Sequence, residues 1–288
     1  MESDVLTEIS PTRYFEVLET LRTDWPHSIH VYYLIKNFIK WINLMDGMDF
    51  KVFCPQSNTK DGVVLIQAKP NDAYLMYMIH SVHKNENDLT KLKEILKETN
   101  VINWSQRVSF EATHEKLNPI LKELAEEKNL KYDHYDYHQV WLPSMKAQNI
   151  KLENLSNNLE LRNLEEQHAD IVNNTWAYKR PGSLEFVQNS IVLNKGIGLF
   201  EKGCDSPMSW NTIQHFYGLG MLYTLEEYRK KGYASVVTLA LSKDLADSGI
   251  DPYACILHDN IPSLTTFDKL GFEKICVVHW GVFSPKSV

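Results

Sequence analysis

The sequence lacks the long hydrophobic run that a membrane-spanning helix requires. Such a helix needs about 18 or more consecutive apolar residues, and the best stretch, near Val236 to Leu241, is far shorter. Basic charge is also scarce, because 30 lysine and arginine residues stand against 37 aspartate and glutamate residues and leave a formal net charge of −7. This balance argues against a general attraction to nucleic acid or to anionic membranes. We therefore expect a soluble protein that holds any anion at a local site.

Closely spaced cysteine pairs are absent as well. The four cysteines, Cys54, Cys204, Cys255 and Cys276, lie far apart and form no Cys-x-x-Cys motif, which disfavours a zinc cluster and a disulfide framework. The first residues are acidic where a secretory or mitochondrial presequence would be basic. These features predict a cytoplasmic protein in a reducing compartment.

The chain does have enough apolar material for two lobes, since its 288 residues are long for one domain and 43% of them are hydrophobic. Periodicity in the first half predicts helices at residues 12–25, 30–44, 88–98 and 114–128, and strands at 50–54, 63–68, 73–79 and 131–142. A polar, aperiodic stretch between residues 143 and 159 indicates a linker. We place an N-terminal α+β lobe at residues 1–150 and a second domain at residues 158–288.

The second half predicts a similar order of elements. Helices are expected at residues 164–176, 184–193, 233–248 and 263–270, and strands at 196–201, 208–214, 217–224, 253–258 and 272–283. No strict sequence repeat is visible, but both halves open with two helices followed by three strands. The first lobe is therefore interpretable as a degenerate copy of the second.

A phosphate-binding pattern lies where a strand runs through a turn into a helix, in the segment Gly218 to Ser235. The start of a helix presents backbone N–H groups without internal partners and a positive dipole end. Gly232 permits close approach of an anion, and Arg229, Lys230 and Lys231 add positive charge. A basic triplet in a turn is more often a solvated surface feature. Its coincidence with a helix start that has no acidic residue in its first turn favours a phosphate site.

The strand before this turn supports a more specific ligand. Gly218 and Gly220 lie within it, and glycine in a strand often marks a bulge or a close backbone approach. An open strand of this kind can hydrogen-bond an extended, amide-bearing arm such as pantetheine. The strand and the turn from Arg229 to Ala234 together point to coenzyme A.

Arg229, Gly232 and Ala234 match the signature Arg/Gln-x-x-Gly-x-Gly/Ala, and at this point the sequence resembles the GNAT superfamily of acyl-CoA-dependent N-acyltransferases. The segment from Tyr223 to Ala234, with Asn260 and Lys269 to Phe272 downstream, is similar to the glycine N-acyltransferase family. The resemblance is strong from about residue 160 onward. It implies an α+β fold with a GNAT-type mixed β-sheet flanked by helices, and an acyl-CoA co-substrate, acetyl-CoA or another, between two parted strands.

Position by position, the resemblance implies a set of cofactor-binding residues. They are Leu222, Tyr223 and Thr224 beside the pantetheine arm, Arg229, Lys230, Lys231, Gly232, Tyr233 and Ala234 around the pyrophosphate, and Asn260 and Phe267 further along. Two departures affect the chemistry. Phe267 replaces a tyrosine that protonates the departing thiolate in many relatives, and Gly218 stands where glycine-acylating relatives have a carboxylate.

The catalytic groups must therefore lie elsewhere. Acyl transfer to an amine needs a group that takes the ammonium proton and donors that stabilise an oxyanion. His215 is the leading candidate because imidazole titrates near physiological pH and this residue lies just ahead of the open strand. A histidine in a hairpin turn is more often simply solvated. Tyr217 and Tyr223 are further candidates acting through water, although tyrosines in strands usually serve packing.

A metal site is not expected. The segment Asp133 to His138 offers nitrogen and oxygen ligands, but on a strand His134 and His138 share a face with Asp136 only at wide separations, and no cysteine supports them.

The sequence as a whole predicts an acyl-CoA-dependent N-acyltransferase that acts on a small amine or on an amino acid such as glycine. A coenzyme A-binding module without catalysis is one alternative, favoured by Gly218 and Phe267. A protein N-acetyltransferase is another. The acyl group, the acceptor and the oligomeric state stay open.

Overall fold

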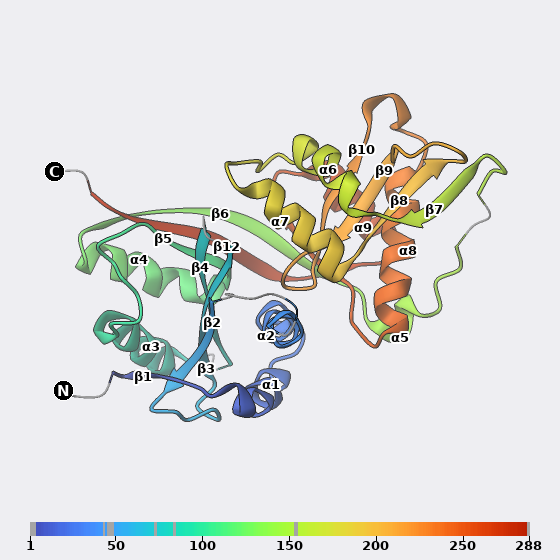
Figure 1. Cartoon of the computed structure of the whole chain (residues 1–288). Helices are drawn as coiled ribbons and strands as arrows, with labels where there is room; N and C mark the ends of the chain where they lie inside the picture. The colour runs from blue at the N-terminus through green and yellow to red at the C-terminus, as the bar shows by residue number, and fades with distance from the viewer. Residues whose placement is uncertain are drawn as a thin grey trace. The chain divides into compact units, whose positions relative to one another are not determined.

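The computed structural model describes residues 4–42, 44, 49–71, 74–82, 85–152 and 155–286. The chain divides into two compact units, one made of Met1–Tyr137 with Cys276–Val288 and the other of His138–Ile275. Each unit combines a β-sheet with flanking helices (Figure 1). In the described part of the chain, no helix is long and apolar enough to cross a membrane.

The first unit is built on the strand order β1-β2-β3-β4-β5-β12-β6. Its strands are β1 (Leu6–Glu8), β2 (Asp49–Pro55), β3 (Val63–Asn71), β4 (Tyr74–Ser81), β5 (Val108–His114), the larger part of β6 (Leu130–Trp141) and the larger part of β12 (Glu273–Pro285). Its helices are α1 (Tyr14–Arg22), α2 (Ile29–Trp41), α3 (Glu86–Glu98) and α4 (Asn118–Glu127). Strands β1 to β4 pair antiparallel, whereas β4 and β5 are parallel.

The second unit has the strand order β7-β8-β9-β10-β11, continued by the end of β6. Its elements are α5 (Ser144–Ala147), β7 (Leu159–Asn163), α6 (Ala169–Thr175), α7 (Ser183–Asn189), β8 (Gly196–Glu201), β9 (Ser209–Ile213), β10 (Leu219–Thr224), α8 (Tyr233–Asp247), β11 (Tyr253–Leu257) and α9 (Ile261–Lys269). Strands β7 to β10 pair antiparallel, and β10 and β11 are parallel.

The two units repeat one topology. Apart from α5 and short 3-10 and π turns, each runs strand, two helices, three strands, helix, strand, helix, strand. The last strand of each repeat is exchanged: β12, which ends the second repeat, pairs antiparallel with β5, and β6, which ends the first, lies beside β11. The predicted α+β fold with a degenerate first copy is confirmed.

Most predicted elements are present within a few residues of the expected bounds, but β1, β5 and β7 were not predicted. Strand β5 escaped prediction because it buries polar side chains, among them Glu111, Thr113 and His114, where an apolar pattern was expected. The helix predicted from residue 114 starts at Asn118 for the same reason, since His114 still belongs to the strand.

The division of the chain also differs from the predicted one. The units separate at residue 137, and the expected linker contains α5 inside the second unit. The last strand joins the first unit because it pairs with β5. Residues 43, 73 and 153–154 of the predicted elements and linker lie outside the described residues.

The exchanged strand supplies a central side chain to the core of the first unit. Phe283 is 0% exposed. Its ring stacks on Tyr132 at 4.4 Å and meets the edges of Trp104 and Phe110 at 5.2 and 5.7 Å. A residue close to the end of the chain therefore stabilises a unit formed mainly by the first half of the sequence.

Replacing the Phe283 ring tests whether β12 completes the core of the first unit. We expect Phe283→Ala to lower the free energy of unfolding by about 3–5 kcal/mol, because it removes a buried aromatic ring and leaves a cavity. Phe15→Ala, at a ring that is 59% exposed, should change it by no more than about 0.5 kcal/mol. Denaturant unfolding followed by circular dichroism measures both. Equal stabilities of the two variants would show that β12 does not complete the first unit.

Candidate active site

Strand β10 carries a bulge at the centre of the second unit. Gly220 lies opposite Thr212 on β9, but the next pair joins Tyr223 to Trp210, so β10 advances three residues while β9 advances two. Met221 adopts a positive φ of 55° within the extra length. A bulge of this kind bends the strand and breaks its ladder of hydrogen bonds.

Beyond the bulge, β10 separates from its parallel neighbour. The two strands pair at Leu219 and Ala254, and in the described part of the chain no later residue of β10 is paired with β11. The edge of Leu222 to Thr224 that faces away from β9 is therefore not paired with β11, although the carbonyl oxygen of Thr224 accepts a hydrogen bond from Arg229. Neither pantetheine nor any other group is assigned to it by the structure, so the roles predicted for these residues stay predictions.

Side chains lie close to Gly220 in β10 and to Gly218, which the structure places just before the strand and not within it as predicted. A Cβ atom at Gly218 would lie 2.5 Å from the ring of Phe216, and one at Gly220 would lie 2.0 Å from Nε2 of Gln214. The first contact explains why no carboxylate stands at position 218, since the ring of Phe216 fills that space. The second contact places a side-chain amide on the bulged strand.

The turn after β10 leads into a helix whose N-terminus is open. Gly232 is the N-cap of α8 in a left-handed conformation (φ 78°), and within the described residues no side chain caps the helix and no acidic residue stands in its first turn. The first backbone hydrogen bond of the helix runs from the N–H of Val236 to the carbonyl oxygen of Gly232, at 3.2 Å. The N–H groups from Tyr233 to Ser235 precede that bond. They are oriented as donors to an anion, and the helix dipole favours negative charge there.

Basic side chains surround this helix start, but Arg229 also holds the turn together. Its Nε donates to the carbonyl oxygen of Thr224 at 3.2 Å, one terminal nitrogen donates to the hydroxyl of Tyr223 at 3.1 Å, and the other lies 3.5 Å from Glu226. Its side chain is 48% exposed. Lys230 and Lys231 are exposed. The structure thus shows a cationic helix start, and the contact of these side chains with phosphate stays a prediction.

The first unit contains the equivalent helix without these features. Helix α3 follows β4 as α8 follows β10, yet the side chain of Asn85 caps it by accepting from the N–H of Asp88 at 3.0 Å. Glu86 and Asp88 place negative charge in its first turn. An anion would meet both an occupied donor and like charge at α3, whereas within the described residues α8 has neither a capping side chain nor an acidic residue in its first turn.

The two catalytic candidates lie at opposite ends of β10. His215 is in the β9–β10 hairpin and is 4% exposed, with its ring 5.3 Å from Phe186 and 4.6 Å from Phe216. The expectation of a solvated hairpin histidine is therefore wrong, because the aromatic rings of α7 and the hairpin enclose it. Tyr223 is partly exposed, stacks on Trp210 at 5.6 Å and is bonded to Arg229. A catalytic role for either stays a prediction.

Three further residues have defined surroundings. Phe267 is 3% exposed and packs edge-on against Phe272 at 4.8 Å, so the structure places it in the core, where a cofactor contact is not shown. Asn260 is exposed, and its side-chain oxygen caps α9 by accepting from the N–H of Ser263 at 3.3 Å. Burial raises the pKa of Tyr217, which keeps its phenol protonated at neutral pH and weakens its case as a base.

Sequence reasoning missed Gln214. Its side chain is half-buried and lies over Gly220 of β10. The only sequence signal was the alternation of two glycines in one predicted strand, which indicates that something approaches the backbone but not which side chain does.

Two family models match the chain. One, described as aralkyl acyl-CoA:amino acid N-acyltransferase, matches residues 62–193, and the other, described as an FR47-like protein, matches residues 196–281. The second match contains β10, the turn and the whole of α8.

Curated relatives point in the same direction. The chain is 28% identical to human glycine N-acyltransferase-like protein 2 over 204 residues, which is 66% of this chain and 68% of that protein. It is 23% identical to bovine glycine N-acyltransferase over 260 residues, 82% of this chain and 84% of that protein.

Solved structures show the fold. A Drosophila protein solved by X-ray crystallography superposes with a TM-score of 0.87 at 21% identity, covering 99% of this chain and 100% of its own. A tandem GNAT protein from the clavulanic acid biosynthesis pathway superposes with a TM-score of 0.56 at 12% identity, covering 98% and 99%. The chain has the GNAT fold and resembles the glycine N-acyltransferase family.

Proposed function

We propose that the chain is an acyl-CoA-dependent N-acyltransferase that moves an acyl group from coenzyme A to a small amine or to an amino acid such as glycine. The observation that carries the proposal is the uncapped start of α8, placed directly after a strand that bulges and parts from its neighbour. These features supply a pyrophosphate site and an adjacent strand edge for the pantetheine arm. The names of the relatives and of the matching family support the acceptor class.

The reaction makes two demands on this site. The neutral amine attacks the thioester carbonyl, the C–S bond breaks, and the thiolate leaves. Backbone N–H groups of the open strand near Leu222 are suited to stabilise the oxyanion that forms in between. The amine must also lose a proton, and the thiolate must gain one.

Proton transfer depends on unusual groups in this chain. Phe267 provides no acid, and Phe216 occupies the space of a carboxylate at Gly218. His215 or water takes the ammonium proton in our proposal. Gln214 cannot act as a base, but its amide on the bulged strand can hydrogen-bond the acceptor and hold the amine in line with the thioester.

A carboxylate in the first turn of α8 tests the phosphate site. Ala234→Asp should weaken coenzyme A binding by about 10-fold or more, because it sets a negative charge beside the pyrophosphate and competes for the same N–H groups. The same change should leave the helix equally stable or stabilise it by about 0.3–1 kcal/mol, since it complements the helix dipole. Isothermal titration calorimetry and thermal unfolding give the two quantities.

Ala234→Asn is the matched control for this experiment, because it has nearly the same size and no charge. It should bind coenzyme A more tightly than the Asp variant. Added salt should reduce this difference in affinity between the two variants, because salt screens the charge of the carboxylate. Wild-type affinity in Ala234→Asp would place the pyrophosphate elsewhere and remove the main support for the function.

Measurements of enzyme turnover distinguish between the catalytic candidates. With acetyl-CoA, longer acyl-CoAs and a panel of small amines that includes glycine, the wild type should release free thiol and form the amide. If His215 is the base, His215→Asn should lower kcat by about 10²–10⁴-fold with unchanged coenzyme A affinity, while Tyr223→Phe should retain activity. Tyr178→Phe, at an exposed ring, is the control. Tight coenzyme A binding with no turnover for any acceptor would instead identify a non-catalytic binding module.

The proposed hydrogen bond from Gln214 to the amine acceptor is tested by kinetics with that acceptor. Gln214→Ala should lower kcat/KM for the amine by about 10-fold, the value of one lost hydrogen bond of about 1.4 kcal/mol, and should leave the KM for acyl-CoA unchanged. Steady-state kinetics with each substrate varied in turn makes the measurement. Equal losses for both substrates would mean that Gln214 only supports the bulge.

A further inference from the structure

A second group of chemically active side chains lies in the first unit and includes none of the residues that the proposed acyl transfer uses. It gathers where β4 and β5 end, the position that corresponds in topology to the parting of β10 and β11. His80 near the end of β4 is fully buried, with Nε2 3.1 Å from Asp24, and His114 at the end of β5 is 8% exposed. Because buried polar side chains are costly unless they are satisfied, such a cluster calls for a function.

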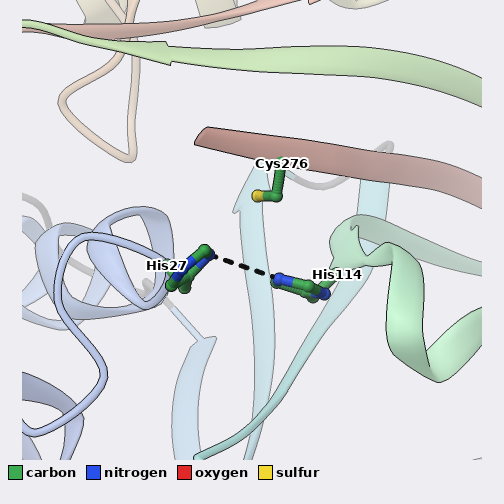
Figure 2. Close-up of side chains that lie close together, drawn as sticks. All are labelled: His27, His114 and Cys276. Atoms are coloured by element: carbon green, nitrogen blue, oxygen red, sulfur yellow. Dashed lines mark hydrogen bonds between the residues drawn. The ribbon is translucent and has the colours of Figure 1, made fainter. Parts of the chain in front are cut away.

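Three members of this group are arranged as metal ligands. Figure 2 shows His27 from the loop between α1 and α2, His114 from β5, and Cys276 from β12 drawn together from distant parts of the sequence. Nδ1 of His27 lies 3.4 Å from Nε2 of His114. One ring nitrogen of each histidine and the Cys276 sulfur all lie within 4.8 Å of one another.

We propose that His27, His114 and Cys276 bind a zinc ion. Zinc takes tetrahedral sets of imidazole nitrogen and thiolate sulfur. With zinc–nitrogen bonds of about 2.0–2.1 Å, two nitrogens of a tetrahedron lie about 3.3–3.4 Å apart, which is the separation already present between the two rings. Three protein ligands leave a fourth position for water or for another small ligand.

Ion binding must overcome two existing hydrogen bonds, one between the two histidines and one from Lys116 to His114. Nδ1 of His114 accepts from the N–H of Lys116 at 3.2 Å, so in the metal-free neutral ring the proton lies on Nε2 and is donated to His27. When zinc binds, this proton moves to Nδ1 and the Lys116 bond is lost. The thiol proton of Cys276 leaves to solvent, and two Zn–N bonds and one Zn–S bond form.

The charges around the site are mixed. Glu115 accepts from the N–H of Val277 at 3.2 Å and so fixes β12 beside Cys276. Asp24 bonds to His80 and lies 3.8 Å from the ammonium of Lys116. The two carboxylates favour a cation and Lys116 opposes it, so the ligand atoms themselves must provide the specificity.

Another group in the same unit serves as a contrast. His134, Asp136 and His279 also bring their ligand atoms within 4.8 Å of one another. Asp136 is 48% exposed, however, and lies at hydrogen-bonding distance from His279, 2.8 Å. Ordinary hydrogen bonding accounts for this group, and it has no thiolate.

Cobalt substitution tests the zinc site in the full-length chain. After removal of metal with a chelator, the wild type should bind one Co²⁺ per chain with a thiolate-to-cobalt charge-transfer band and intense tetrahedral d–d bands, and Zn²⁺ should displace it. Cys276→Ser should abolish the charge-transfer band. His27→Gln and His114→Gln should each weaken Co²⁺ binding on the order of 100-fold or more, because each removes one of three ligands.

Two matched variants serve as controls. Cys204→Ser removes an exposed free cysteine, and His134→Gln removes a histidine of the contrasting group; both should keep the cobalt spectrum of the wild type. The absence of the charge-transfer band in the wild type, its survival in Cys276→Ser, or its loss in Cys204→Ser would each overturn the proposal.

A folding defect is separable from the loss of a ligand. Circular dichroism checks that each variant is folded. If Cys276→Ser does not fold, the Co²⁺ affinity of His27→Gln tests the proposal instead. An unchanged Co²⁺ affinity in His27→Gln would overturn the proposal. None of these measurements uses acyl transfer. Failure of the zinc site would therefore leave the proposed function untouched, and the reverse also holds.

Discussion

The proposed coenzyme A site depends on backbone N–H groups that no side chain caps at the start of α8 in the described part of the chain. The left-handed Gly232 brings the chain into the helix without a capping side chain, and the first helical bond reaches back only from Val236. Such donors bind an anion well because the helix dipole adds to them. The unpaired edge of β10 is a candidate ligand site because the strand leads directly to these N–H donors.

The internal repeat sets a helix start without a capping side chain or acidic first turn beside an equivalent one that has both. Helices α3 and α8 occupy the same place in the topology. In α3, Asn85 occupies a donor and Glu86 and Asp88 bring negative charge. The first repeat thus keeps the fold without the anion site, while its polar residues gather at the ends of β4 and β5. Exchange of the last strands makes each unit dependent on the other half of the sequence, which is why Cys276 reaches His27 and His114.

At the candidate active site, packing decides the available side chains as much as charge does. Phe216 covers Gly218, Gln214 covers Gly220, and Phe267 is buried against Phe272. A family pattern read position by position indicates which groups are missing at these sites. It does not indicate that the side chain of Gln214 lies over the bulged strand, because that contact depends on how the hairpin folds back.

The sequence by itself determined the features that depend on near neighbours. The helix start from Arg229 to Ala234, the periodic helices and the apolar strands were predictable because their signals lie within a few residues. Tertiary structure alone decided the rest. Strand β5 is polar yet buried, His215 is enclosed by rings from another helix, and the last strand completes the first unit. Each of these depends on contacts between residues far apart in the chain, and local periodicity carries no information about such contacts.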